Sequence, residues 1–196
     1  MKNLHSIIDF LFEVGILSKT PRSWVYFLGS GKQSVAEHLN RVTYIGFVLA
    51  KMIPEADEGK ILKMCLFHDL AEARTSDLNY VHQQYVTANE EKALSDIANA
   101  VPFGQEIKEL VNERNKAETL EGKIARDADQ LEFLLSLKEQ HDTGNTRAET
   151  WIPSLLKRLK TEEAKQLAET IIATKSDEWW FSDKESDWWV NRGEKN

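Results

Sequence analysis

Three side chains that can bind a metal ion or move a proton, His68, Asp69 and Glu72, stand within one short phrase of the sequence. The apolar run over residues 61–67 predicts a helix that begins near residue 57 and continues through this phrase toward residue 74. On a helix, the side chains of His68 and Asp69 leave the backbone about 100° apart, so both can reach one cation. Glu72 lies one helical turn after His68, on the same side. Taken alone, a His-Asp pair is more typical of a solvated helix surface.

Two other segments supply side chains of the same kind. His38 stands near the start of another predicted helix, where a capping or hydrogen-bonded histidine is as good an interpretation as a metal ligand. Asp127 and Asp129 stand in a strongly apolar helix, and a buried carboxylate is costly unless it is paired or bound to metal. The two aspartates project about 200° apart, so we expect only one of them to be a ligand. The apolar stripe of this helix lies nearer to Asp127, so periodicity alone leans toward that residue.

Helices must position these groups, because apolar residues recur at helical spacing along most of the chain. The stretch 18–34 is different: it carries Pro21, Gly29 and Gly31 among aromatic residues and is expected to be a long loop rather than a helix. No strand-like alternation, internal repeat or low-complexity tract is present. We therefore expect an all-α fold, a single-domain helical bundle over residues 1–175. The predicted helices cover residues 4–15, 35–54, 57–74, 88–100, 104–115, 119–144, 147–159 and 162–174.

Composition excludes several classes of protein. The chain of 196 residues has a formal net charge of −7, which argues against a general nucleic-acid binder. Its single cysteine, Cys65, rules out an internal disulfide and is expected to be a buried thiol. Neither a secretory signal nor an apolar run of membrane-spanning length is apparent, so we expect a cytoplasmic protein that does not enter membranes. Residues 176–196 hold four of the six tryptophans, and this tail is expected to dock on the body or on another subunit.

The metal-ligand candidates together follow a known pattern. His38, then the His68-Asp69 pair, then an aspartate followed by any residue and Leu, resemble the H…HD…D pattern of the HD-domain phosphohydrolases. The resemblance selects Asp129 as the last ligand, against the local periodicity. A helix central to a bundle can be apolar on several faces, so we follow the resemblance.

Within that superfamily the chain is most similar to the HD-domain 5′-deoxynucleotidases. Members share an arginine and a tryptophan in the loop before the first histidine, here Arg22 and Trp24, and an extended phrase after the HD pair, here residues 68–78. The resemblance spans approximately residues 4–140. The chain departs from the family at Ser76, where the Thr-Gly-Asp phrase has glycine, and at Ser23, which separates Arg22 from Trp24.

The resemblance implies one divalent transition-metal ion and a phosphate ester as substrate. Two imidazoles and two carboxylates suit Mn, Co, Fe, Ni or Zn. Glu72 is the first candidate for orienting water or transferring a proton, and Asp77 is the second. Arg22 offers a planar fork for phosphate or sugar oxygens, and Trp24 a flat wall against a sugar hydroxyl. The implied metal ligands are His38, His68, Asp69 and Asp129. The implied substrate contacts are Arg22, Trp24, His38, Asp69, Asp77 and Asp129.

The predicted activity is hydrolysis of deoxynucleoside 5′-monophosphates to nucleoside and phosphate, by a homodimer that takes a small-molecule nucleotide and no nucleic-acid polymer. One alternative keeps the metal site and changes the substrate to a cyclic or polyphosphorylated nucleotide. The sequence shows no adjacent regulatory domain or second set of ligand pairs for it. The other alternative is a non-catalytic nucleotide-binding protein. The intact ligand set, with Glu72 and Asp77, argues against that one.

Overall fold

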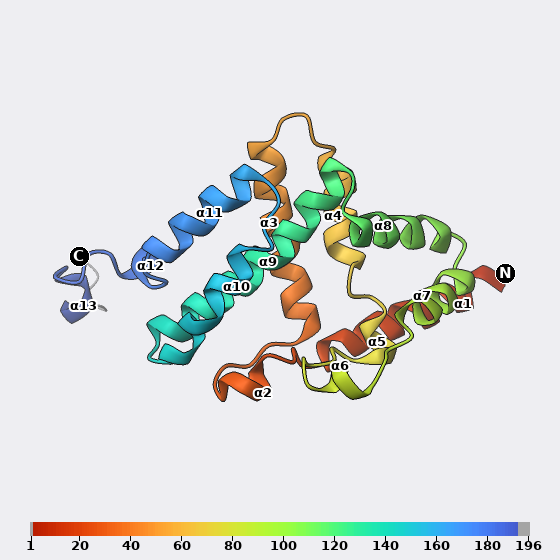
Figure 1. The fold of residues 1–196 in the computed structure, drawn as a ribbon, viewed down its shortest axis with the longest axis horizontal. Coiled ribbons are helices and arrows are strands. Elements are labelled where there is room, and N and C mark those ends of the chain that lie inside the picture. Colours follow the sequence, from red (N-terminus) through yellow and green to blue (C-terminus); the bar gives the residue numbers. More distant parts are fainter. Residues whose placement is uncertain (1, 192–196) are drawn as a thin grey trace.

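Three helices that bury apolar stripes against one another form the centre of the fold (Figure 1). They are α3 (Val35–Met52), α4 (Glu58–Phe67) and α9 (Leu120–Asp142) in the computed structural model, which describes residues 2–191. Each begins after a residue whose side chain accepts a hydrogen bond from a backbone N–H of the first turn. These capping residues are Ser34, Asp57 and Thr119.

The other helices surround these three. α8 and α11 pack on α9, and α7 packs between α8 and α1. Residues 2–191 contain no β-strand, only an isolated bridge between Pro21 and Ser34, so the all-α prediction is confirmed. The remaining helices are α1 (Lys2–Val14), η1 (Gly15–Ser18), α2 (Val25–Leu28), α5 (Glu72–Thr75), α6 (His82–Tyr85), α7 (Glu90–Ala100), α8 (Gly104–Lys116), η2 (Thr146–Trp151), α10 (Ile152–Leu156), α11 (Glu162–Ala173), α12 (Glu178–Phe181) and α13 (Trp188–Asn191).

Two groups of buried apolar side chains hold the helices together. The larger group lies between α3, α4, α9 and α11 and includes Met64, Cys65 and Leu131. The smaller group lies among α1, α3, α7 and α8 and includes Leu70. Phe67, the last residue of α4, contacts both groups. The chain therefore passes from one group to the other directly at the His-Asp pair.

The segment between η1 and α3 is a closed loop rather than an open one. The Arg22 N–H donates to the carbonyl of Gln33 (2.9 Å), and the Val35 N–H donates to the carbonyl of Thr20 (2.8 Å). Inside the loop, α2 forms one helical turn and ends at Gly29, whose φ of 70° suits glycine. The prediction of a loop without helix is wrong for these four residues, because the turn buries Leu28 in the interior while Tyr26 and Phe27 remain exposed.

The C-terminal tail lies at the opposite end of the molecule from α1 (Figure 1). Its aromatic side chains contact one another: the rings of Trp180 and Phe181 stack with centroids 5.2 Å apart, and those of Trp188 and Trp189 meet edge to face at 4.6 Å. Trp179 borders a groove of about 330 Å³ between α9 and α11. Docking of the whole tail stays a prediction. None of the helices in residues 2–191 is both long enough and apolar enough to cross a membrane.

Candidate metal centre and its pocket

His38, His68 and Asp69 come from two distant parts of the sequence and meet in the structure. Their ligand atoms all lie within 4.8 Å of one another. Asp69 Oδ2 is 3.6 Å from Nε2 of His38 and 3.3 Å from Nε2 of His68. Asp129 approaches from α9, with Oδ1 3.3 Å from Nε2 of His38. Both imidazole rings are buried. The ligand atoms of His38, His68 and Asp69 thus lie together in one group, and Asp129 lies beside them through its contact with His38.

The His-Asp pair lies in a turn and not within a helix, which corrects the sequence prediction. α4 ends at Phe67, and the N–H of Leu70 donates to the carbonyl of Phe67 (3.0 Å). That contact spans three residues, a tighter winding than the four of an α-helix. The cause is packing: Cys65 is buried in the larger apolar group and Leu70 in the smaller one. The turn carries His68 and Asp69 between them.

The nitrogens of the two histidines fit a metal ion. Nδ1 of His38 lies 2.6 Å from Oε2 of Glu132, and Nδ1 of His68 lies 2.9 Å from the carbonyl of Cys65. Each Nδ1 thus has its own acceptor, which leaves Nε2 with a lone pair. Neither Nε2 is solvated or has a hydrogen-bond partner among the described residues. Ligand atoms about 2.1 Å from one ion and at right angles are about 3 Å apart, close to the N···O spacings seen here.

The two aspartates of α9 face different neighbours. Asp127 is fully buried, as periodicity predicted, but it accepts hydrogen bonds from the N–H groups of Lys160 (2.8 Å) and Thr161 (2.7 Å). It also accepts one from the Thr161 hydroxyl (2.7 Å) and so holds the start of α11. Asp129 faces His38 and accepts a hydrogen bond from Arg114 (2.5 Å). Of the two, only Asp129 lies at the candidate centre.

Arginines and histidines keep the two central carboxylates ionised. Burial favours the protonated form of Asp69, but the charges of His68 and Arg22 hold its pKa below the usual range. Burial acts on Asp129 in the same direction, and Arg114 together with His38 and His68 outweighs it, so that its pKa also lies well below the usual value. Both side chains can therefore offer charged oxygens to a cation at neutral pH.

Glu72, the first residue of α5, has the opposite electrostatic setting. Burial and the negative charges of Asp69 and Asp77 raise its pKa to about 10. Its Oε2 is buried and has no hydrogen-bond partner within the described part of the chain. In the absence of a cation this carboxyl group carries its proton at neutral pH. It does not line the cavity described next.

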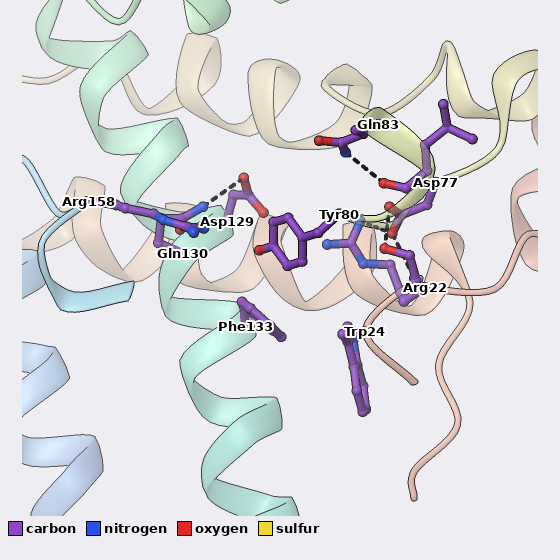
Figure 2. Close-up of a pocket in the computed structure, with 11 residues that line it drawn as sticks. Arg22, Trp24, Asp77, Tyr80, Gln83, Asp129, Gln130, Phe133 and Arg158 are labelled. Carbon is purple, nitrogen blue, oxygen red and sulfur yellow. Dashed lines mark hydrogen bonds and ion pairs between the residues drawn. The ribbon is translucent and has the colours of Figure 1, made fainter. Parts of the chain in front are cut away.

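A cavity of about 140 Å³ opens beside the carboxylates (Figure 2). Arg22 reaches Asp69 (3.2 Å) and Asp77 (3.0 Å) through Nη1. Asp77 also accepts hydrogen bonds from the backbone N–H (3.1 Å) and hydroxyl (2.8 Å) of Ser23, so the serine that departs from the family pattern anchors the loop. Trp24 is buried and presents its ring to the same space.

Several residues of the site escaped the sequence analysis. Tyr80, Phe133 and Arg158 line the cavity, and Arg114 pairs with Asp129. These four carry no pattern in the sequence that separates them from ordinary aromatic and basic residues. Glu132 is different: it is a carboxylate in the same apolar helix as Asp129, and the rule that flagged that aspartate applies to it equally.

Proteins of similar sequence identify the family of this chain. The profile of the HD-domain family matches residues 14–171. A 5′-deoxynucleotidase of Schizosaccharomyces pombe is 27% identical over 165 residues, 77% of this chain and 82% of the relative. A 5′-deoxynucleotidase of Dictyostelium discoideum is 28% identical over 148 residues, 69% of this chain and 78% of the relative.

Solved structures give the same result for the fold. A conserved hypothetical protein from Pyrococcus furiosus superimposes with a TM-score of 0.73 and 30% sequence identity, over 85% of this chain and 99% of the other. The family match extends from the end of α1 to α11 and includes every residue of the candidate centre. With this match over most of its length, the chain belongs to the HD-domain family.

Proposed function

We propose that this protein hydrolyses deoxynucleoside 5′-monophosphates to nucleoside and inorganic phosphate. The observation that carries the proposal is the pair of buried Nε2 atoms, without hydrogen bonds, that face Asp69 and Asp129 beside a cavity bordered by Arg22 and Trp24. The names of the yeast and Dictyostelium relatives, both 5′-deoxynucleotidases, support the choice of substrate class.

In this proposal four residues hold one divalent first-row transition-metal ion. When bound, the ion would polarise the phosphoryl group and lower the pKa of a water molecule. The protein's part is to keep two carboxylates ionised and to direct Nε2 of two imidazoles at the ion, and the hydrogen bonds at Nδ1 of each ring fix that direction. The ligands are His38, His68, Asp69 and Asp129.

Arg22 binds the phosphate in this scheme. Its guanidinium group lies between Asp69 and Asp77, so the carboxylates hold the planar fork at the mouth of the cavity. Its Nε is buried and has no acceptor within the described chain. A phosphate oxygen would supply one. The positive charge also offsets repulsion between the nucleotide and the carboxylates of the site.

Glu72 is the proposed proton donor. Hydrolysis breaks the bond between phosphorus and O5′ of the nucleoside, and that oxygen must gain a proton as it leaves. A carboxyl group with a pKa raised to about 10 by burial and by Asp69 retains such a proton at neutral pH. Asp77 remains the second candidate for proton transfer, although its contacts with Arg22 and Ser23 suit a positioning role in the loop.

The sugar and base occupy the rest of the cavity. In this scheme the Trp24 ring, which lines the cavity, stands against the 2′ position of the sugar, so an extra hydroxyl group would be crowded. Tyr80 and Phe133 also line the cavity and offer aromatic surfaces to the base (Figure 2). Contacts of this kind are tolerant of base identity, because every base has a flat face.

Phosphate release by metal-stripped protein tests the proposal. With Mn²⁺ or Co²⁺ restored, deoxynucleoside 5′-monophosphates should be hydrolysed about tenfold or more faster than the ribonucleotides, since one crowded group is worth about 1–3 kcal/mol. Asp69→Ala should abolish release. Asp96→Ala, a change at a surface aspartate paired with Lys92, should not.

Two results would replace the proposal. Release from cyclic or polyphosphorylated nucleotides alone would identify the same metal centre with a different substrate. Nucleotide binding without release under any of the five metals would identify a binding protein.

Assembly and domain limits are the last parts of the proposal. We propose a homodimer, which sedimentation velocity tests directly. The catalytic domain covers residues 1–175, and residues 176–196 form an appended tail. Trp179 and Trp188 of this tail are largely exposed and offer one apolar surface for a second subunit. A chain that ends at residue 175 and stays dimeric would show that the tail is not that surface.

A further inference from the structure

Glu132 is a fully buried carboxylate one helical turn after Asp129 on α9. It lies 2.6 Å from Nδ1 of His38 and accepts hydrogen bonds from Nε of Arg41 (2.9 Å) and Nε2 of Gln33 (2.7 Å). Ser136 donates a further one (3.2 Å). Its oxygens are therefore occupied by protein donors, so Glu132 itself is not a further metal ligand. Its effect on the site must pass through the residues that it touches.

The contact with His38 fixes the state of that ring. An ionised carboxylate only accepts hydrogen bonds, so Nδ1 of His38 must carry the proton that lies between them. The other nitrogen, Nε2, is then the one available to a metal ion, and it faces Asp69 and Asp129 at 3.6 and 3.3 Å. The direction of the ring is fixed as well, because the short contact is buried and cannot be exchanged for water.

The contact with Gln33 links Glu132 to Trp24, which lines the cavity. The indole N–H of Trp24 donates to Oε1 of Gln33 (3.2 Å), while Nε2 of Gln33 donates to Glu132. An indole only donates and a carboxylate only accepts, so the Gln33 amide can satisfy both partners in one orientation alone. A continuous chain of hydrogen bonds thus runs from Trp24 through Gln33 and Glu132 to His38.

We propose that Glu132 is a positioning residue: it sets the tautomer and orientation of His38 for the metal and, through Gln33, ties the pocket wall at Trp24 to the metal centre. The inference rests on the metal site of the proposed function but not on the identity of the substrate. Groups that orient a metal-bound histidine typically change metal affinity by about 10–100-fold when they are replaced.

Glu132→Gln tests the first half of the proposal, with Co²⁺ affinity measured by chelator competition and the visible spectrum of the Co²⁺ protein as readouts. We expect affinity to fall about 10–100-fold and the spectrum to change, since an amide can present N–H to His38. Glu139→Gln is the matched control. Glu139 accepts a hydrogen bond from Nη1 of Arg41 (2.6 Å), just as Glu132 accepts one from Nε of Arg41. Glu139, however, is partly exposed and has no contact with His38.

Equal Co²⁺ affinity in wild type and Glu132→Gln would overturn the proposal. Equal losses in Glu132→Gln and Glu139→Gln would overturn it too, because they would trace the effect to Arg41 alone. Thermal unfolding of the metal-free variants shows how far each is destabilised without the ion. Wild-type protein that binds Co²⁺ but hydrolyses no nucleotide would end the proposed function and leave this test intact.

Gln33→Met and Trp24→Phe test whether the pocket wall at Trp24 is tied to the metal centre. Both variants retain Glu132, so they remain informative if Glu132→Gln does not fold. Met removes the amide at similar size, and Phe removes the indole N–H but keeps a flat wall. We expect Gln33→Met to weaken Co²⁺ binding several-fold and to raise KM for the nucleotide. The double variant should bind Co²⁺ no worse than Gln33→Met alone, because both changes cut the same chain. Additive losses, or no loss in Gln33→Met, would show that the pocket wall and the metal centre are independent.

Discussion

Two faces of α9 each bury a carboxylate, and the partners of these carboxylates differ in kind. On one face, Asp127 accepts hydrogen bonds from two backbone N–H groups and a hydroxyl at Thr161 and Lys160, all of them neutral donors that begin α11. On the other face, Asp129 meets an imidazole nitrogen of His38 and the guanidinium of Arg114. The partners of Asp129 outweigh the cost of burying its charge and lower its pKa, whereas burial outweighs the neutral donors at Asp127 and raises its pKa.

The comparison shows that burial by itself does not identify a ligand. Asp127 has the apolar setting that periodicity favours, yet both of its oxygens accept hydrogen bonds from Lys160 and Thr161, away from the two histidines. Asp129 has an oxygen directed at His38 Nε2, an atom with no hydrogen bond within the described structure. The useful distinction is therefore whether a buried carboxylate faces only backbone and hydroxyl donors, as Asp127 does, or also a histidine nitrogen that could bind a metal, as Asp129 does.

Asp129→Asn should produce the largest effect of any change on α9. Removing one charged ligand weakens metal binding and the polarisation that depends on it, and about 4 kcal/mol of lost stabilisation corresponds to about 10³-fold in rate. Phosphate release and Co²⁺ affinity should both fall, and the metal-free protein should also lose stability, because Arg114 is left without its charged partner. Retention of full Co²⁺ affinity would remove Asp129 from the ligand set.

Asp127→Asn should lower the stability of the protein without lowering its affinity for Co²⁺. The amide places an N–H group against donors of Lys160 and Thr161, so one buried hydrogen bond is lost and another is opposed. We expect the free energy of unfolding to fall by about 2 kcal/mol, measured by urea denaturation. Co²⁺ affinity of the folded variant should equal that of the wild type. A loss of affinity as large as that of Asp129→Asn would mean that the two faces are not separate.

Cys65 provides a smaller, independent measure of the same contrast. Burial raises the pKa of its thiol to about 12, so at pH 8 it should react with a thiol reagent only when the core opens. A loss of about 2 kcal/mol in Asp127→Asn should speed labelling about 30-fold while Co²⁺ affinity stays unchanged. Labelling of native wild-type protein at the rate of an exposed thiol would contradict this.

The same thiol predicts a pH dependence of stability. Its pKa is higher in the folded state than the ordinary value of 9.0, so the folded protein holds the proton that the unfolded chain releases. The contribution is complete below pH 9 and declines as pH rises from 9 toward 12. Cys65→Ala should remove this component of the slope in urea denaturation at successive pH values.

Much of the fold follows from local patterns. The apolar spacing predicts α3 and α9 to within a few residues of their observed ends, and it predicts the start of α4 but not its end at Phe67. Periodicity also predicts that Asp127 is buried and that Cys65 is an interior thiol. These properties concern a single helix and the side of it that is buried, so the sequence of that helix is enough to predict them.

The order of residues by itself thus determined an all-α chain, the types of side chain available for a metal, and the resemblance that chose Asp129. Only the tertiary structure decided that His68 and Asp69 lie in a turn between two apolar groups, and that Glu132 and Gln33 link Trp24 to His38. The physical reason is that helical spacing gives the angle at which a side chain leaves its own helix. Which donor or acceptor the side chain then meets depends on other helices. These helices are distant in the sequence and come together only when the apolar groups pack.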